Sequence, residues 1–134
     1  MCGIFFVHSK KDILNKNRCD KIKKTLYNRG PDFLKYNYFF DDKVFLLNSI
    51  LSITGKNNNI KDLIKSQNKN FIISFNGQIY NYKDFIKNDF NLDQSASDTE
   101  VLINLYQQSP NNSDFLDSLK GMFACIILDI KKKK

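Results

Sequence analysis

The start of the chain carries its most reactive combination of groups. Removal of Met1, which is usual before a small residue, would leave Cys2 with both a thiol and a free α-amine. The thiol has an ordinary pKa near ~8.5 and the amine one near ~7.7–8.0, so the amine can act as a base near neutral pH. The dipeptide therefore allows a cysteine nucleophile that is deprotonated by its own amine. Taken alone, however, the dipeptide favours the other interpretation, a small buried or incidental cysteine before a strand.

A second group of interest is the dipeptide Asn76-Gly77, which follows the strongly apolar run 71–75. Asn-Gly between two β-rich runs predicts a hairpin with a type I′ turn. The alternative is a chemical role, because the Asn side-chain amide and the Gly backbone N–H are both hydrogen-bond donors.

A third candidate is Asp98, in the run Ser97-Asp98-Thr99-Glu100. Ser97 and Glu100 have the spacing of a helix capping box. A carboxylate near a helix N-terminus is stabilised by the helix dipole, so a structural role accounts for Asp98 at little cost.

The flanking segments must position these groups. The apolar run 3–7 predicts a buried strand directly after Cys2. Asp12 is expected to cap a helix that runs towards Tyr27. The apolar side of this helix would consist of Leu14, Ile22 and Leu26. Residues 28–32 contain adjacent Gly and Pro and predict a turn.

The rest of the chain alternates between apolar runs and polar breaks. Strands are expected over 36–40, 44–53, 71–75 with a continuation at 78–80, and 121–130. Helical turns are expected over 82–88, after Ser97 and near Leu116 and Leu119. Turns, loops or irregular links are expected over 41–43, 55–59 and 60–69, and a solvated basic tail over 131–134.

Composition limits the class of protein. The 134 residues are enough for one domain with a real core, and 42% hydrophobic content argues against disorder. The net charge of +7 suggests an anionic partner, but the basic residues are scattered and only Arg18 and Arg29 are arginines. We therefore rank a nucleic-acid binder last.

The cysteines and apolar runs also bear on compartment. Three cysteines without metal spacing predict neither a disulfide framework nor a zinc site. No segment resembles a secretory leader or a membrane span. We expect no membrane partner and a reducing cytoplasm.

Six motifs, in order along the chain, resemble the class II glutamine amidotransferase domain of asparagine synthetase type, an N-terminal-nucleophile hydrolase. They are Met-Cys-Gly-Ile at 1–4, Arg-Gly-Pro-Asp at 29–32, Leu-Ser-Ile at 51–53, Asn-Gly-Gln-Ile-Tyr-Asn at 76–81, Ser-Asp-Thr-Glu-Val at 97–101 and Leu-Lys-Gly-Met-Phe-Ala at 119–124. The resemblance covers essentially the whole chain.

The resemblance implies a set of roles in glutamine hydrolysis. The Cys2 thiolate would attack the side-chain amide of L-glutamine, and its α-amine would pass the proton to departing ammonia. Asn76 and Gly77 would form the oxyanion hole, and Asp98 would bind the substrate ammonium. The pocket would be lined by Ile50, Leu51, Ser52, Ile53, Thr54 and Gln78. The structural loop beside it would be Arg29, Gly30, Pro31 and Asp32.

It also implies partners and a fold. This domain would need no cofactor, since ATP and magnesium belong to a synthetase domain that receives the ammonia. A homodimer is kept as a candidate assembly. The fold would be α+β, a four-layer αββα sandwich of two antiparallel sheets. We expect the domain to span residues 1–130 and to be incomplete at its C-terminal end, with late strands missing and a sheet edge exposed.

The chain departs from the family pattern at several positions. Ile50 stands where the family has an arginine for the glutamine α-carboxylate, and an aliphatic side chain cannot replace a guanidinium. Lys43 or Lys56 could replace it only if the fold brings one of them close. The other departures are Gln78 in place of an acid, Asn28 in place of His and Phe33 in place of Gly. The alternative function is therefore a catalytically impaired domain with a binding or regulatory role.

Overall fold

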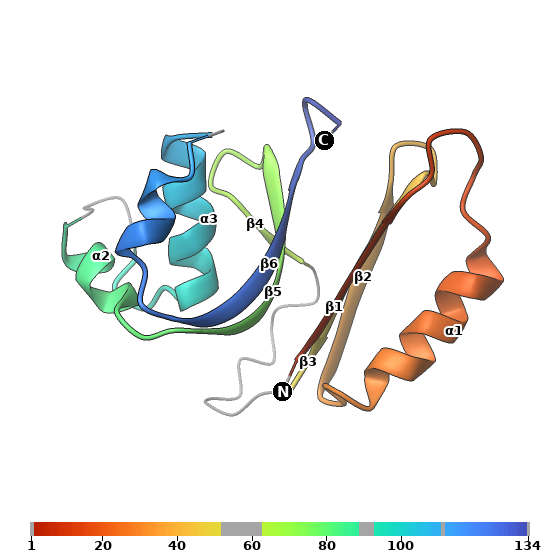
Figure 1. Ribbon diagram of the computed structural model, residues 1–134, viewed down its shortest axis with the longest axis horizontal. Coiled ribbons are helices and arrows are strands. Elements are labelled where there is room, and N and C mark those ends of the chain that lie inside the picture. Colours follow the sequence, from red (N-terminus) through yellow and green to blue (C-terminus); the bar gives the residue numbers. More distant parts are fainter. Residues whose placement is uncertain (1, 52–62, 89–92, 111, 134) are drawn as a thin grey trace. The chain divides into compact units, whose positions relative to one another are not determined.

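The computed structural model describes residues 2–51, 63–88, 93–110 and 112–133 (Figure 1). The chain forms two compact units. The first contains Met1–Leu63 with Ser74–Asn76, and the second contains Ile64–Ile73 with Gly77–Lys134.

The first unit is built on the central strand of a three-stranded antiparallel sheet. The strands are β1 (Gly3–His8), β2 (Phe33–Phe39) and β3 (Val44–Ile50), in the order β1-β3-β2. Val44 to Ser49 are all buried, as expected for an apolar strand that is covered on both faces. In the register, Ser49 lies opposite Gly3 and Ile50 lies opposite Phe33.

Helix α1 (Lys16–Tyr27) packs on one face of this sheet (Figure 1). Cys19 of the helix packs there against Phe45 and Leu47 of β3. The helix begins later than expected, because the side chain of Asn15 accepts the hydrogen bond of the Arg18 amide at 3.2 Å. The predicted cap at Asp12 is therefore wrong. Several Asx residues in this stretch are equally good caps, and propensity does not choose between them.

The second unit contains the sheet β4-β5-β6, formed by β4 (Ile64–Lys65), β5 (Phe71–Ile79) and β6 (Gly121–Asp129). β5 and β6 are antiparallel, since Tyr80 N donates to Lys120 O at 2.7 Å at one end and Ile130 N to Asn70 O at 2.8 Å at the other. The helices of this unit are α2 (Tyr82–Asn88), α3 (Asp98–Gln108) and the 3₁₀ turn η1 (Asp114–Ser118).

The predicted hairpin at Asn76-Gly77 is wrong, because β5 continues without a turn to Ile79. Gly77 is required for a different reason. Its φ is 139°, and a Cβ there would lie 2.2 Å from Met122 O and 2.4 Å from Phe123 Cα. The glycine thus allows the backbone of β6 to approach closely.

Two other strand boundaries also differ from the prediction. β2 begins at Phe33 instead of residue 36, and β3 ends at Ile50 instead of residue 53, with Leu51 outside any strand. The early start of β2 follows from its pairing with β3, which the residue types of 33–35 do not reveal.

The capping box at the start of α3 is confirmed. Ser97 Oγ accepts from Glu100 N at 3.3 Å, and Glu100 Oε2 accepts from Ser97 N at 2.7 Å. The α+β class and the two antiparallel sheets are also confirmed. The four-layer sandwich stays a prediction.

Truncation of Leu47 should destabilise the protein. Leu47 is 0% exposed in the core beneath α1, so Leu47→Ala leaves a cavity and should lower the free energy of unfolding by about 2–5 kcal/mol. Urea denaturation followed by circular dichroism measures this loss. The control is Ile13→Ala, because Ile13 is 67% exposed and its truncation should change stability by less than about 0.5 kcal/mol. Equal effects of the two substitutions would contradict the assigned core.

Candidate active site

Cys2 lies directly before β1, at one end of the first sheet. It is half-buried, and its thiol is 3.9 Å from the carbonyl oxygen of Leu51, at the limit of a weak sulfur hydrogen bond. The Arg29 guanidinium donates from Nε to Cys2 O at 3.3 Å. The nucleophile candidate is therefore held from two segments that are distant in sequence.

The loop Arg29–Asp32 packs tightly on the end of β3. A Cβ on Gly30 would lie 2.4 Å from Ile50 N, so only glycine fits there. Pro31 forms a bridge with Ile50, and Asp32 N donates to Ile50 O at 3.2 Å. The first unit thus brings together Cys2, this loop and residues 50–51.

The middle of β5 belongs to the same unit. Ser74 Oγ donates to Leu47 O at 3.0 Å, and both residues are fully buried. This bond anchors the segment that ends in the half-buried Asn76. Asn76 therefore shares a compact unit with Cys2.

The remaining predicted site residues lie in the second unit. Gly77 and Gln78 are exposed. Asp98 is held against β5, since its Oδ2 accepts from Ile79 N at 3.0 Å and its Oδ1 accepts from Thr99 N at 2.8 Å. This contact places the carboxylate beside the strand segment that contains Gly77 and Gln78.

Other residues that the sequence suggested for the site either lie outside the described part of the chain or lie far from Ile50. Ser52, Ile53 and Thr54 lie outside the described residues, as do Met1 and Lys56. Lys43 precedes β3 at the end opposite to Ile50, seven residues away, which corresponds to about 23 Å along a strand. Lys43 therefore does not take the place of the missing arginine.

The sequence reasoning also missed polar residues of the first sheet. It assigned Arg29 to a structural loop and did not anticipate its contact with Cys2. It did not single out Lys35 or Asn48, which are each 8% exposed. The sequence could have identified these two residues, because a lysine and an asparagine are unusual within runs of otherwise apolar or aromatic residues.

Comparison with known proteins decides the family. The family model described as "Glutamine amidotransferase domain" matches residues 1–134. The chain belongs to this family. The predicted resemblance to the class II, asparagine synthetase type is thereby confirmed.

Curated relatives agree with the family model. The chain is 31% identical to asparagine synthetase [glutamine-hydrolyzing] 2 of Oryza sativa subsp. japonica, covering 99% of this chain and 22% of the relative. It is 32% identical to asparagine synthetase B [glutamine-hydrolyzing] of Escherichia coli K12, with 98% and 24% covered. The putative asparagine synthetase [glutamine-hydrolyzing] 2 of Methanocaldococcus jannaschii is 28% identical, with 98% and 28% covered. The chain thus spans about a quarter of the length of these relatives.

No three His, Cys, Asp or Glu side chains of the described residues gather as metal ligands would. No described helix combines the length and apolar character needed to cross a bilayer.

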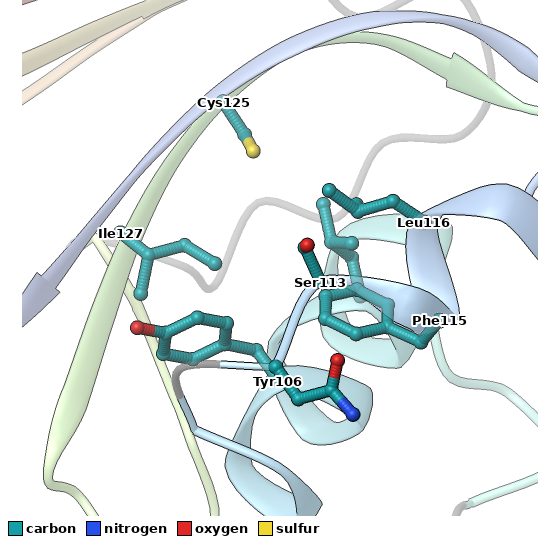
Figure 2. Close-up of a pocket in the computed structure, with 8 residues that line it drawn as sticks. Tyr106, Ser113, Phe115, Leu116, Cys125 and Ile127 are labelled. Atoms are coloured by element: carbon teal, nitrogen blue, oxygen red, sulfur yellow. The ribbon is translucent and has the colours of Figure 1, made fainter.

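A cavity of about 340 Å³ lies in the second unit of the amidotransferase domain (Figure 2). Its walls come from α3, from η1 with the residues before it, and from β6. The lining residues are Leu102, Tyr106, Asn112, Ser113, Phe115, Leu116, Cys125 and Ile127. Figure 2 shows Cys125 and Ile127 of β6 facing Phe115 and Leu116. No charged group lines the cavity, and it contains none of the predicted site residues.

The Cys125 thiol should react slowly with an alkylating agent. Burial raises its pKa, so at any given pH less of it is the reactive thiolate than for a free cysteine. Near pH ~8.5, where an ordinary thiol is half ionised, alkylation by iodoacetamide should run below half of its high-pH rate. Mass spectrometry of the Cys125 peptide over a pH series measures this. The control is the same thiol in urea, and an equal midpoint in both conditions would contradict the assigned burial.

Proposed function

We propose that this amidotransferase domain hydrolyses glutamine through Cys2 and supplies ammonia to a synthetase module. The observation that carries the proposal is the position of Cys2 in a chain of this family: it is half-buried before β1, its carbonyl accepts from Arg29, and its thiol lies 3.9 Å from Leu51 O. The printed names of the relatives describe glutamine-hydrolysing asparagine synthetases, which favours asparagine formation as the acceptor reaction.

The chemistry starts with removal of Met1, which frees the α-amine of Cys2. The amine accepts the thiol proton, and the thiolate attacks the side-chain amide carbon of glutamine. Collapse of the tetrahedral intermediate breaks the C–N bond, and the amine returns the proton to the departing ammonia. Water then hydrolyses the thioester, so the products are glutamate and ammonia.

Asn76 and Gly77 are proposed to stabilise the intermediate oxyanion. The side-chain amide of Asn76 and the N–H of Gly77 are donors on consecutive residues of one strand. Anchoring of the segment by the Ser74–Leu47 bond supports this role, because an oxyanion hole stabilises charge only when its donors are held in place beforehand.

Asp98 is proposed to bind the α-ammonium of glutamine. Its two oxygens already accept hydrogen bonds from Ile79 N and Thr99 N. Oδ1 also accepts from Thr99 Oγ1 at 3.4 Å, whereas Oδ2 has a further lone pair, so an ammonium can be added at Oδ2 without loss of these bonds. The backbone contacts would then orient the carboxylate for a charge-assisted hydrogen bond. Gln78, in the same strand segment, would line the pocket together with Ile50–Thr54.

The wider assembly is also part of the proposal. The domain itself would use no cofactor, and ATP with magnesium would act in a synthetase domain that receives the ammonia. We retain the four-layer sandwich, the cytoplasmic location and a homodimer as expectations.

One observation favours a second function, a domain that binds or regulates without turnover. Ile50 has an aliphatic side chain, its carbonyl is occupied by Asp32 N, and Lys43 is remote. A site without a cation for the α-carboxylate would bind glutamine poorly.

Loss of the thiol should abolish glutamine hydrolysis. Purified protein with processed Met1 should release glutamate from glutamine, and Cys2→Ala should reduce release to the buffer background because no thioester can form. An enzyme-coupled glutamate assay measures the rate. The control is Cys125→Ala, which removes a thiol of the second unit and should retain activity. Equal release by the Cys2→Ala variant and the parent protein would refute the catalytic assignment.

Removal of one oxyanion donor should slow hydrolysis without preventing binding. We expect Asn76→Ala to lower kcat by about 10²–10³-fold, with a smaller effect on KM, because the lost bond forms mainly in the transition state. Steady-state kinetics with glutamine separates the two parameters. Asn68→Ala, a change in a loop of the second unit, is the matched control. A pure rise in KM for Asn76→Ala would assign Asn76 to substrate binding instead.

A further inference from the structure

Strand β6 (Gly121–Asp129) forms one edge of the second sheet and is unusually apolar for an edge strand. The strand order is β4-β5-β6, so within the described residues only one side of β6 is paired. From Gly121 to Leu128 the strand has no charged residue and no proline. The strand at the other edge, β4, has only two residues, one of them a lysine. Native edges are commonly short, charged or interrupted, because a long apolar edge is a template for pairing with another strand.

The backbone hydrogen bonds show which residues of β6 point to its free side. Lys120 O accepts from Tyr80 N, and Ile130 N donates to Asn70 O. The bonded residues are ten positions apart on each strand, so the pairing contains no extra residue. In antiparallel strands the N–H and C=O of one residue point to the same side, and successive residues alternate. The odd-numbered residues of β6 therefore direct their backbone groups to the free edge.

The side chains beside this edge are apolar and incompletely covered. Cys125 and Ile127 line the cavity of the second unit, where they face Phe115 and Leu116 (Figure 2). Cys125 and Ile127 are half-buried, and Leu116 is 40% exposed. Contact with a further apolar strand would remove more of this surface from water, which favours association.

A second copy of β6 can pair with this edge in a symmetric register. Cys125 is the central residue of the strand, and a two-fold axis at this residue pairs every outward-pointing residue with another one. Cys125 then lies opposite Cys125 of the second copy, Phe123 opposite Ile127, and Gly121 opposite Asp129. A shift of the axis along the strand would leave outward-pointing residues of β6 without a partner. The aromatic–β-branched pair occurs twice in this register and is favourable, and no like charges meet.

The charges at the two ends of β6 favour the same antiparallel arrangement. Before the strand lie the exposed residues Asp114, Asp117 and Lys120, which together are negative. The strand ends in Asp129, and the exposed lysines 131–133 follow it, so this end is positive. Antiparallel pairing of two copies places the positive end of one beside the negative end of the other. Parallel pairing would bring like charges together.

We propose that two copies of this domain associate through the free edges of β6, with Cys125 of one copy opposite Cys125 of the other. The two three-stranded sheets then form one continuous six-stranded antiparallel sheet. Each copy contributes one β6 edge, so the assembly closes at two copies. The inference goes beyond glutamine hydrolysis and does not depend on it.

The first test measures association of the 134-residue chain by sedimentation equilibrium. We expect a dimer that dissociates on dilution. Cys125→Pro removes an N–H that points away from β5, a position where an edge strand tolerates proline. Two hydrogen bonds across the axis are lost, so the dimer dissociation constant should rise about 10- to 100-fold. The matched control is Cys125→Ala, which keeps the N–H and should leave the dissociation constant within about threefold of that of the parent.

The second test measures the register by oxidation of the dimer with copper–phenanthroline. Opposite residues of a hydrogen-bonded pair have Cα atoms about 5.5 Å apart, within the range of a disulfide. An alkaline buffer is needed, because burial raises the pKa of Cys125. In the Cys2→Ala background we expect a covalent dimer, with the Cys125 peptide linked to itself in mass spectrometry. Cys2→Ala/Cys125→Ala retains only the buried Cys19 and should give no covalent dimer. The same oxidation in urea should also give none.

The remaining results would overturn the proposal. They are a monomer at every concentration, an assembly larger than two copies, and a dimer that Cys125→Pro does not weaken. A dimer without the Cys125 link would place the contact at another register or another surface. If Cys125→Pro does not fold, as judged by circular dichroism, the link in the Cys2→Ala protein decides the question.

Discussion

The pairing of β3 with both of its neighbours is the constraint on which the first unit depends. β3 is buried from Val44 to Ser49, so its backbone groups must be satisfied by β1 on one side and β2 on the other. This register places Cys2 close to the end of β3, at Ile50 and Leu51. It also presents the end of β3 to the loop Arg29–Asp32, whose glycine allows contact at backbone distance.

The proposed nucleophile, Cys2, lies at a position where residues are poorly ordered unless they are tied down. Here the strand after Cys2 is paired along its whole length, and the Cys2 carbonyl accepts from Arg29 at 3.3 Å. Arg29 thus holds Cys2 through its carbonyl oxygen, and the thiol takes no part in this bond. This arrangement suits the role proposed for Cys2, that of a nucleophile which also serves as base once Met1 is removed.

The one charged group of the proposed site is positioned by backbone contacts. The carboxylate of Asp98 is oriented by two backbone amides, one of them from β5. Under the proposed function this carboxylate would meet the ammonium of glutamine, while the aliphatic side chain of Ile50 offers no cation for the substrate carboxylate.

Motif order along the sequence was enough to predict the family, the capping box of α3, most strands and helices, and Cys2, Asn76, Gly77 and Asp98 as site candidates. These features depend on local residue types, which a single chain displays directly. Tertiary structure alone decided that Gly77 serves close packing with β6 and not a turn, and that β2 begins at Phe33 through its pairing with β3. Each of these depends on strand register or on contact between segments far apart in the chain. Neither composition nor spacing encodes such contacts, because many registers satisfy the same local preferences.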